Sequence, residues 1–174
     1  MGKLSRRIAT GATVLVTLVG VGAGGAAALT DSSVGSPRTS GPEHITIIET
    51  SFSGGPVFLR GLVDDAGVDN ESPDGTTSRF VLSGGTITAA HESSENGGDF
   101  VPNPVTCVAR LTDAGSFTVT GGTGEYSDVS GSGTYTGKGT LVFPRTSAGC
   151  DFNADPILTT IVINATGTFR LGKV

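Results

Sequence analysis

The stretch that decides the fold is Gly115-Ser-Phe-Thr-Val-Thr-Gly-Gly-Thr-Gly-Glu-Tyr-Ser-Asp-Val-Ser-Gly-Ser-Gly-Thr-Tyr-Thr-Gly-Lys-Gly-Thr-Leu-Val-Phe143. At its start, Phe117 and Val119 alternate with polar residues, and this two-residue side-chain period gives a strand one buried and one solvated face. The glycines within 121–124 then permit a tight turn with positive φ. A glycine-studded strand and a short strand at 140–143 complete three predicted strands of an all-β domain.

Short apolar runs bounded by turn residues extend this pattern along the chain, and no window after residue 28 shows a sustained helical period. The other expected strands are 44–51, 56–63, 79–90 as one bent strand or two, 105–111, and a closing pair at 157–164 and 166–171. Residues 112–115 are expected to turn the chain. The pattern favours an antiparallel eight-stranded (eight or nine) up-and-down barrel of calycin-like appearance, because closure removes exposed strand edges. A sandwich is the second choice.

The interior of this barrel is predicted to hold a modest pocket. Phe117, Val119, Leu141 and Phe143 are expected on the strands beside the glycine turn. Eight strands is the size at which side chains just fill a barrel or leave room for one small ligand. Because the chain has no Trp, only two Tyr and 28 Gly, we expect part of the interior to stay unfilled.

Residues 64–75 are predicted to form an acidic loop between two strands. The oxygen-bearing side chains in it are Asp64, Asp65, Asp69, Asn70, Glu71 and Asp74. Calcium prefers such oxygens as ligands, but the spacing departs from that of an EF-hand loop. A solvated acidic loop is therefore favoured over a calcium site, and no metal or cofactor is assigned.

The N-terminal segment, 1–28, is typical of an export signal. Three basic residues precede an uncharged run that ends in Ala26-Ala27-Ala28, where cleavage is expected. Residues 29–42 have few groups to bury and predict a flexible leader, and 43–174 suit a single domain. The expected product is secreted and extracellular, with no membrane segment left after cleavage.

The two cysteines, Cys107 and Cys150, are expected to pair in a disulfide because the chain is predicted to be exported. The bond would tie the loop that begins at Pro144 to a strand containing Cys107. A redox-active or metal-binding pair is the weaker alternative, since the chain has no Cys-x-x-Cys motif and no histidine nearby to complete a zinc site.

Charge and motifs argue against several function classes. After residue 28 the chain holds eight Lys or Arg against sixteen Asp or Glu, so nucleic acid is not an expected partner. The run Gly131-Ser-Gly-Thr-Tyr-Thr-Gly-Lys138 is not a phosphate loop, because Gly139 stands where Ser or Thr is required. No Gly-x-Ser-x-Gly motif of a serine hydrolase is present.

The segment Gly121-Gly-Thr-Gly-Glu-Tyr126, followed by Gly131-Ser-Gly133, resembles the Gly-Gly-Thr-Gly-x-Tyr/Phe-x-x-x-x-Gly-x-Gly signature of the allene oxide cyclase and dirigent barrel superfamily. The chain is most similar to its small secreted bacterial members of unassigned activity. The resemblance implies an eight-stranded antiparallel barrel with a mainly apolar interior, in which the plant enzymes steer a reactive small molecule towards one stereoisomer. It carries over no catalytic residue.

Tyr126, Tyr135 and Arg110 are the candidate ligand-binding residues. The tyrosine hydroxyls can contact a ligand, although packing plus one hydrogen bond is the favoured role. Arg110 would orient a ligand if it pointed inward, but the outer face is favoured. Two hypotheses result. The leading one is a non-enzymatic barrel that binds a small apolar molecule or a surface partner, and the alternative is a dirigent- or cyclase-like catalyst.

Overall fold

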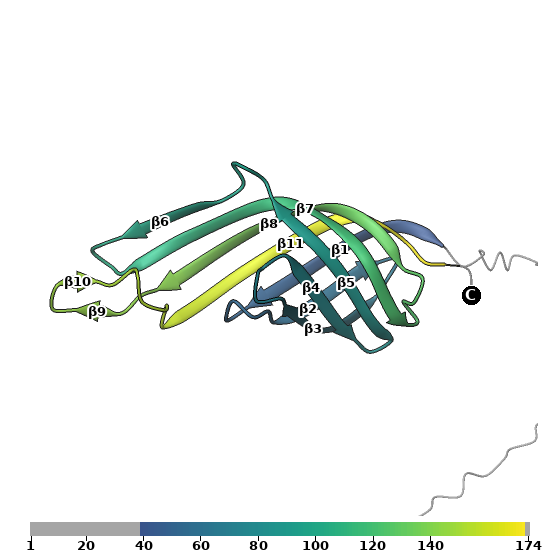
Figure 1. Ribbon diagram of the computed structural model, residues 1–174, viewed down its shortest axis with the longest axis horizontal. Coiled ribbons are helices and arrows are strands. Elements are labelled where there is room, and N and C mark those ends of the chain that lie inside the picture. The colour runs from purple at the N-terminus through teal and green to yellow at the C-terminus, as the bar shows by residue number, and fades with distance from the viewer. Residues whose placement is uncertain (1–38, 173–174) are drawn as a thin grey trace, which may run out of the picture. The chain divides into compact units, whose positions relative to one another are not determined.

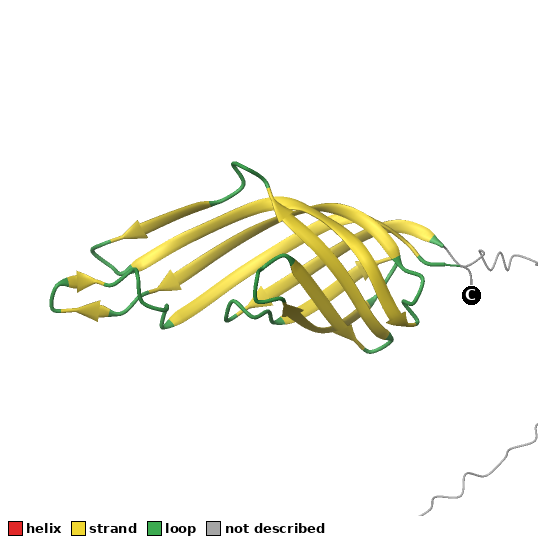
Figure 2. Ribbon diagram, viewed as in Figure 1, coloured by secondary structure: helices red, strands yellow, loops and turns green. Residues whose placement is uncertain are grey.

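The computed structural model describes residues 39–172, which contain eleven strands and no helix (Figures 1 and 2). Accordingly, no helix able to cross a membrane is found in this part of the chain. The strands are β1 (Ser40–Glu49), β2 (Pro56–Gly61), β3 (Asp65–Glu71), β4 (Thr77–Leu82), β5 (Gly85–Ser93), β6 (Asp99–Asn103), β7 (Val108–Gly124), β8 (Ser130–Val142), β9 (Arg145–Thr146), β10 (Gly149–Cys150) and β11 (Leu158–Arg170).

Eight of these strands close into an antiparallel barrel, which confirms the predicted fold class. Strands β1 to β5 pair in sequence order, β5 pairs with β7, and β7, β8 and β11 lead back to β1. The extra strand β6 pairs with the first part of β7, whereas β5 pairs with its second part. Strands β7, β8 and β11 therefore run on past the barrel, towards β6, β9 and β10 (Figure 1).

The ends of the domain differ from expectation in one respect. The predicted signal peptide, 1–28, and the first part of the predicted leader lie outside the described residues. The strand β1 already begins at Ser40, inside the segment expected to be a leader, and Ser40 pairs with Arg170 of β11. Pairing with a long partner strand extends β1 through residues whose side chains have little to bury.

The predicted turn at 112–115 is wrong, because β7 runs through it without a break. Ala114 and Gly115 keep their register opposite Thr136 and Tyr135 of β8. A Cβ on Gly115 would lie 2.8 Å from the Tyr135 ring, so the glycine makes room for an aromatic side chain within a strand. The separate strands predicted on either side of 137–139 and around 165 are likewise continuous, as β8 and β11.

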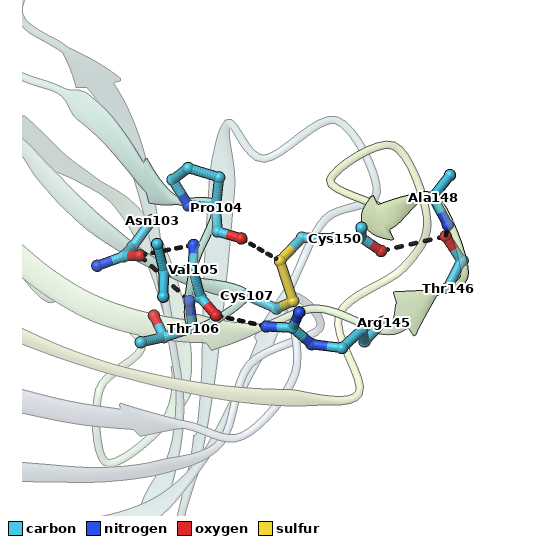
Figure 3. Close-up of a disulfide and its surroundings, with 10 residues drawn as sticks. Asn103, Pro104, Val105, Thr106, Cys107, Arg145, Thr146, Ala148 and Cys150 are labelled. Carbon is cyan, nitrogen blue, oxygen red and sulfur yellow. Dashed lines mark hydrogen bonds between the residues drawn. A yellow bond between two sulfur atoms is a disulfide. The ribbon is translucent and has the colours of Figure 1, made fainter.

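The predicted disulfide between Cys107 and Cys150 is confirmed (Figure 3). Cys107 lies in the turn before β7, with a positive φ of 58°, rather than in a strand as predicted. The backbone N–H of Cys107 donates to the Asn103 carbonyl at 3.0 Å, and Arg145 donates to the Val105 carbonyl. The bond therefore joins the β6–β7 turn to the β9–β10 hairpin.

Buried apolar side chains form two clusters. The larger one fills much of the barrel and includes Val57, Leu59, Ile87, Phe117 and Phe169. The smaller one lies in the extension and consists of Ala109, Leu141 and Phe143, with Leu111 and Phe152 packed against it. Phe117, Val119 and Leu141 lie on the strands beside the glycine turn as expected, and Phe143 directly follows β8, but the two pairs belong to different clusters.

Glycines of β8 and β11 make space for the aromatic core of the barrel. Phe117 is 6% exposed and meets Phe169 edge to face, with ring centroids 6.3 Å apart. A Cβ on Gly133 would lie 2.6 Å from the Phe117 ring, and one on Gly167 would lie 3.0 Å from it. Only Gly124, with φ of 64°, adopts the left-handed turn conformation expected for the glycine turn.

We predict that Phe117→Ala destabilises the protein by about 3–5 kcal/mol, because it removes a buried ring and leaves its glycine cradle empty. Urea unfolding followed by circular dichroism measures the change in the free energy of unfolding. The matched control is Phe58→Ala on the outer face of β2, where the side chain is 37% exposed. Equal losses for the two variants would contradict this description of the core.

Candidate functional site

The barrel encloses a cavity of about 250 Å³ at the end where β1, β3 and β5 finish. Its walls are mainly apolar, formed by Ile45, Ile47, Phe80, Ala89, Phe117, Ile161, Ile163 and Ala165. Two exposed residues, Phe52 after β1 and Ser93 at the end of β5, also line it, so it opens to solvent at this end. Towards the opposite end, larger side chains such as Leu59 and Phe169 pack without exposure.

Polar side chains gather at one end of this cavity, from five different strands. They are Glu49 of β1, Glu71 of β3, His91 and Ser93 of β5, and Asp113 of β7, together with Tyr135 of β8. The alternation of each strand explains this, because every one of these positions points inward. The cavity thus combines apolar walls with an acidic end.

Tyr135 and Asp113 form a satisfied hydrogen-bond network at this end. The Tyr135 hydroxyl donates to Asp113 Oδ2 at 2.9 Å and lies 3.1 Å from Ser93 Oγ, which itself lies 3.1 Å from Asp113 Oδ2. Burial raises the pKa of Tyr135, and the neighbouring Asp113 carboxylate raises it further. Tyr135 is therefore held as a neutral phenol with its hydroxyl position fixed.

The carboxyl group of Glu49 is different, because it is buried without a partner. Glu49 is 3% exposed, and its Oε1 atom accepts no hydrogen bond. Asp69, 1% exposed, lies nearby with an equally unpartnered Oδ1, although it does not line the cavity. Burial, with the charges of Glu71 and Asp69, raises the pKa of Glu49 to about 7.

The neighbours of Glu49 are acidic too. Burial and the charge of Glu71 raise the pKa of Asp69 to about 6. Burial also raises the pKa of Glu71, while His91 opposes that effect, with its Nε2 atom 4.0 Å from Glu71 Oε1. His91 is the one basic side chain among the described residues that line the cavity.

The structure places the three candidate ligand-binding residues in different surroundings. Tyr135 lines the cavity. Tyr126 lies in the packed core, where its hydroxyl donates to Asp65 Oδ2 at 2.7 Å, and it does not reach the cavity. Arg110 is exposed on β7, in the extension, opposite Val101 of β6. One of the three candidate ligand-binding residues therefore lines the cavity, and the cavity carboxylates were not among the candidates.

Two of the missed carboxylates, Asp69 and Glu71, come from the predicted acidic loop, and that prediction is wrong. Most of 64–75 is strand β3, and only the end of the segment is a turn. Asp69 and Glu71 point into the barrel, while Val68 and Asn70 face outward. The signal that could have revealed the strand is the two-residue spacing of Asp65, Gly67, Asp69 and Glu71.

A calcium site formed by the whole acidic segment does not match this arrangement. In the turn after β3, Asp74 accepts hydrogen bonds from Ser72 and Thr76, with Oγ distances of 2.6 and 2.9 Å to its Oδ1 atom. It therefore caps the turn, apart from the inward carboxylates. Across residues 39–172, no group of three or more His, Cys, Asp or Glu side chains has a metal-binding arrangement.

Comparison with known proteins adds no relative: no family model, no curated protein and no solved structure matches this chain.

We predict that Glu49→Gln stabilises the protein at pH 8 and has less effect at pH 5. The folded-state pKa of Glu49, about 7, lies above the ordinary value of 4.5, so its contribution to stability is present below pH 4.5 and lost as pH rises to 7. A shift of this size corresponds to a few kcal/mol, roughly 3. Calorimetric melting at both pH values measures the difference.

The control for this prediction is Glu95→Gln, which changes an exposed carboxylate in the β5–β6 loop. Its melting temperature should follow that of the parent protein at both pH values. A Glu49→Gln variant that differs from the parent equally at pH 5 and pH 8 would show that Glu49 does not titrate as described.

Proposed function

We propose that this protein binds a small, mainly apolar molecule inside its barrel. The observation that carries the proposal is the cavity of about 250 Å³, lined mainly by Ile, Phe and Ala side chains, in a barrel that is otherwise packed. For scale, an apolar cavity of about 150 Å³ in a protein interior holds benzene. By proportion, this one suits a ligand of roughly ten non-hydrogen atoms.

The energetics of an unfilled cavity support the same proposal. A void removes contacts from the side chains around it and lowers the stability of the fold. A molecule that binds the folded state alone restores those contacts and raises stability by mass action. The inward positions near the cavity include Ala89, Gly137 and Ala165, which are too small to fill it themselves.

We also propose that the protein acts outside the cell. The charged and then apolar start of the chain supports export, and the Cys107–Cys150 disulfide is compatible with an oxidising compartment. Membership of the allene oxide cyclase and dirigent barrel superfamily is a proposal of the same kind. Its support is the Gly-Gly-Thr-Gly segment at 121–124 and the closed eight-stranded barrel.

We predict that n-butylbenzene, which has ten non-hydrogen atoms, raises the melting temperature of the protein in a concentration-dependent way. Gly137→Leu should abolish this shift, because Gly137 lines the cavity and a Cβ there would make only ordinary contacts, with Ile163 Cγ1 3.6 Å away and Asp113 Cβ 3.8 Å away. Differential scanning fluorimetry measures both effects. Thr136→Leu, on the outer face of the same strand, is the matched control and should keep the shift.

Two outcomes would contradict the binding proposal. If n-butylbenzene produces no shift in the parent protein, the cavity is not a site for apolar ligands. A shift that survives in Gly137→Leu would place the binding elsewhere on the protein.

A second candidate function, a dirigent- or cyclase-like catalyst, is favoured by the carboxyl group of Glu49. Its pKa of about 7, raised by burial, would let it donate a proton near neutral pH to an oxygen of a bound molecule, such as an epoxide. The test is the enantiomeric ratio of the product that forms when an unsaturated epoxide cyclises with the protein present. A ratio equal to that without protein, or unchanged in Glu49→Gln, would count against catalysis.

A further inference from the structure

We propose that the ligand of this cavity carries a cationic group, such as a protonated amine, on its apolar body, and that Glu49 and Glu71 hold that group. This inference rests on the proposed function, since it assumes that the cavity is a ligand site. It goes further by assigning the chemical class of the ligand.

The first support is the unpartnered carboxylate of Glu49. This side chain lines the cavity, is 3% exposed, and leaves its Oε1 atom without a hydrogen bond. A buried acceptor without a partner costs free energy, and a buried charge without one costs more. Glu43, at the other end of β1, also has an unpartnered Oε1 atom, but its Oε2 atom accepts a hydrogen bond from the Val63 N–H at 2.8 Å and it does not line the cavity. Within the described residues, the chain supplies no such donor to Glu49 Oε1.

The second support is the balance of charge around the cavity. Glu49, Glu71 and Asp113 line it, and the single basic side chain among the described lining residues is His91. His91 lies beside Glu71, at 4.0 Å, and Asp113 already accepts hydrogen bonds from Tyr135 and Ser93. Glu49 can therefore still accept a hydrogen bond from a cationic group. An anionic ligand would be repelled by three carboxylates.

The third support is the geometry of the acidic end relative to the apolar walls. Glu49 and Glu71 are the last residues of β1 and β3, the two strands on either side of β2, and Phe52 and Gly75 lie at the same mouth. Ile45, Phe80 and Phe117 line the deeper part. An ammonium group donates hydrogen bonds in three directions and can contact both glutamates while its apolar substituent stays among these side chains.

The same arrangement makes binding of a cation depend on pH. The titratable groups that face Glu49 are Asp69 and Glu71 from β3, His91 from β5, Asp113 from β7 and Tyr135 from β8. Burial raises the pKa of Glu49 to about 7 and that of Asp69 to about 6. An amine stays protonated across this range, so its affinity should rise from pH 5 to pH 8 as the carboxyl groups ionise.

The experiment compares three probes of nearly equal size on the full chain by isothermal titration calorimetry at pH 8. The probes are 3-phenylpropylamine, 3-phenyl-1-propanol and 3-phenylpropionate, which are cationic, neutral and anionic. We expect the amine to bind at least tenfold more tightly than the alcohol, and the carboxylate to bind more weakly than either. The preference for the amine should shrink at pH 5.

Two variants test which residues hold the cation. Glu49→Gln should lower the affinity for the amine to about that for the alcohol. It should leave the affinity for the alcohol within twofold of its value in the parent protein. Glu71→Gln, at a less buried position, tests the second glutamate and serves if Glu49→Gln does not fold. Glu95→Gln, at an exposed position, should change neither affinity.

The possible failures are distinguishable. If n-butylbenzene and the alcohol bind but the amine binds no more tightly at pH 8, the cation inference is overturned and the apolar site remains. An amine preference that survives both Glu49→Gln and Glu71→Gln also overturns it. If no neutral probe and no amine binds, the proposed function fails together with the inference.

Discussion

Closure of the barrel is the constraint on which the rest of the structure depends. Once β5 pairs with β7 and β11 pairs with β1, eight strands enclose an interior of nearly fixed size, and side-chain volume alone decides how much of it is filled. Phe117 and Phe169 fill one end, over glycines that leave room for their rings. Towards the other end several inward positions carry small residues, such as Ala89, Gly137 and Ala165, and the isoleucines beside them leave the cavity unfilled.

Burying carboxylates in such an interior opposes folding. Apolar side chains at Glu49 and Asp69 would satisfy both the alternation of the strands and the packing of the barrel, whereas the carboxyl groups lose hydration and gain few partners. Their raised pKa values reflect this cost, because burial in the folded state favours the neutral form of each group over the ionised form. Residues that break a local folding rule without a compensating contact are most readily explained by a role in function.

The sequence predicted the parts of the fold that depend on alternation and on cysteine pairing. Phe117 and Val119 indicated an inward face, and Cys107 with Cys150 indicated the disulfide. It could not distinguish a turn from a strand at 112–115, because aspartate and glycine are typical of turns. Here Gly115 instead lies opposite the inward Tyr135 in a paired strand, and Asp113 accepts a hydrogen bond from the Tyr135 hydroxyl. The prediction of a loop at 64–75 was wrong for a related reason. The inward residues of this strand are acidic, so it lacks the apolar alternation by which strands are recognised.

The extension helps to explain why the acidic end of the cavity is a defined site. Strands at the rim of a barrel tend to fray, since their last residues have pairing on few sides. Here β7, β8 and β11 continue past the rim, so Asp113 and Gly137 lie in the middle of paired strands. Their far ends are held by the Leu141 and Phe143 cluster and by the disulfide at Cys107. The same continuous pairing fixes the Tyr135 hydroxyl against Asp113, and this removes Asp113 as a free acceptor. Glu49, on the shorter strand β1, has no such partner for its Oε1 atom.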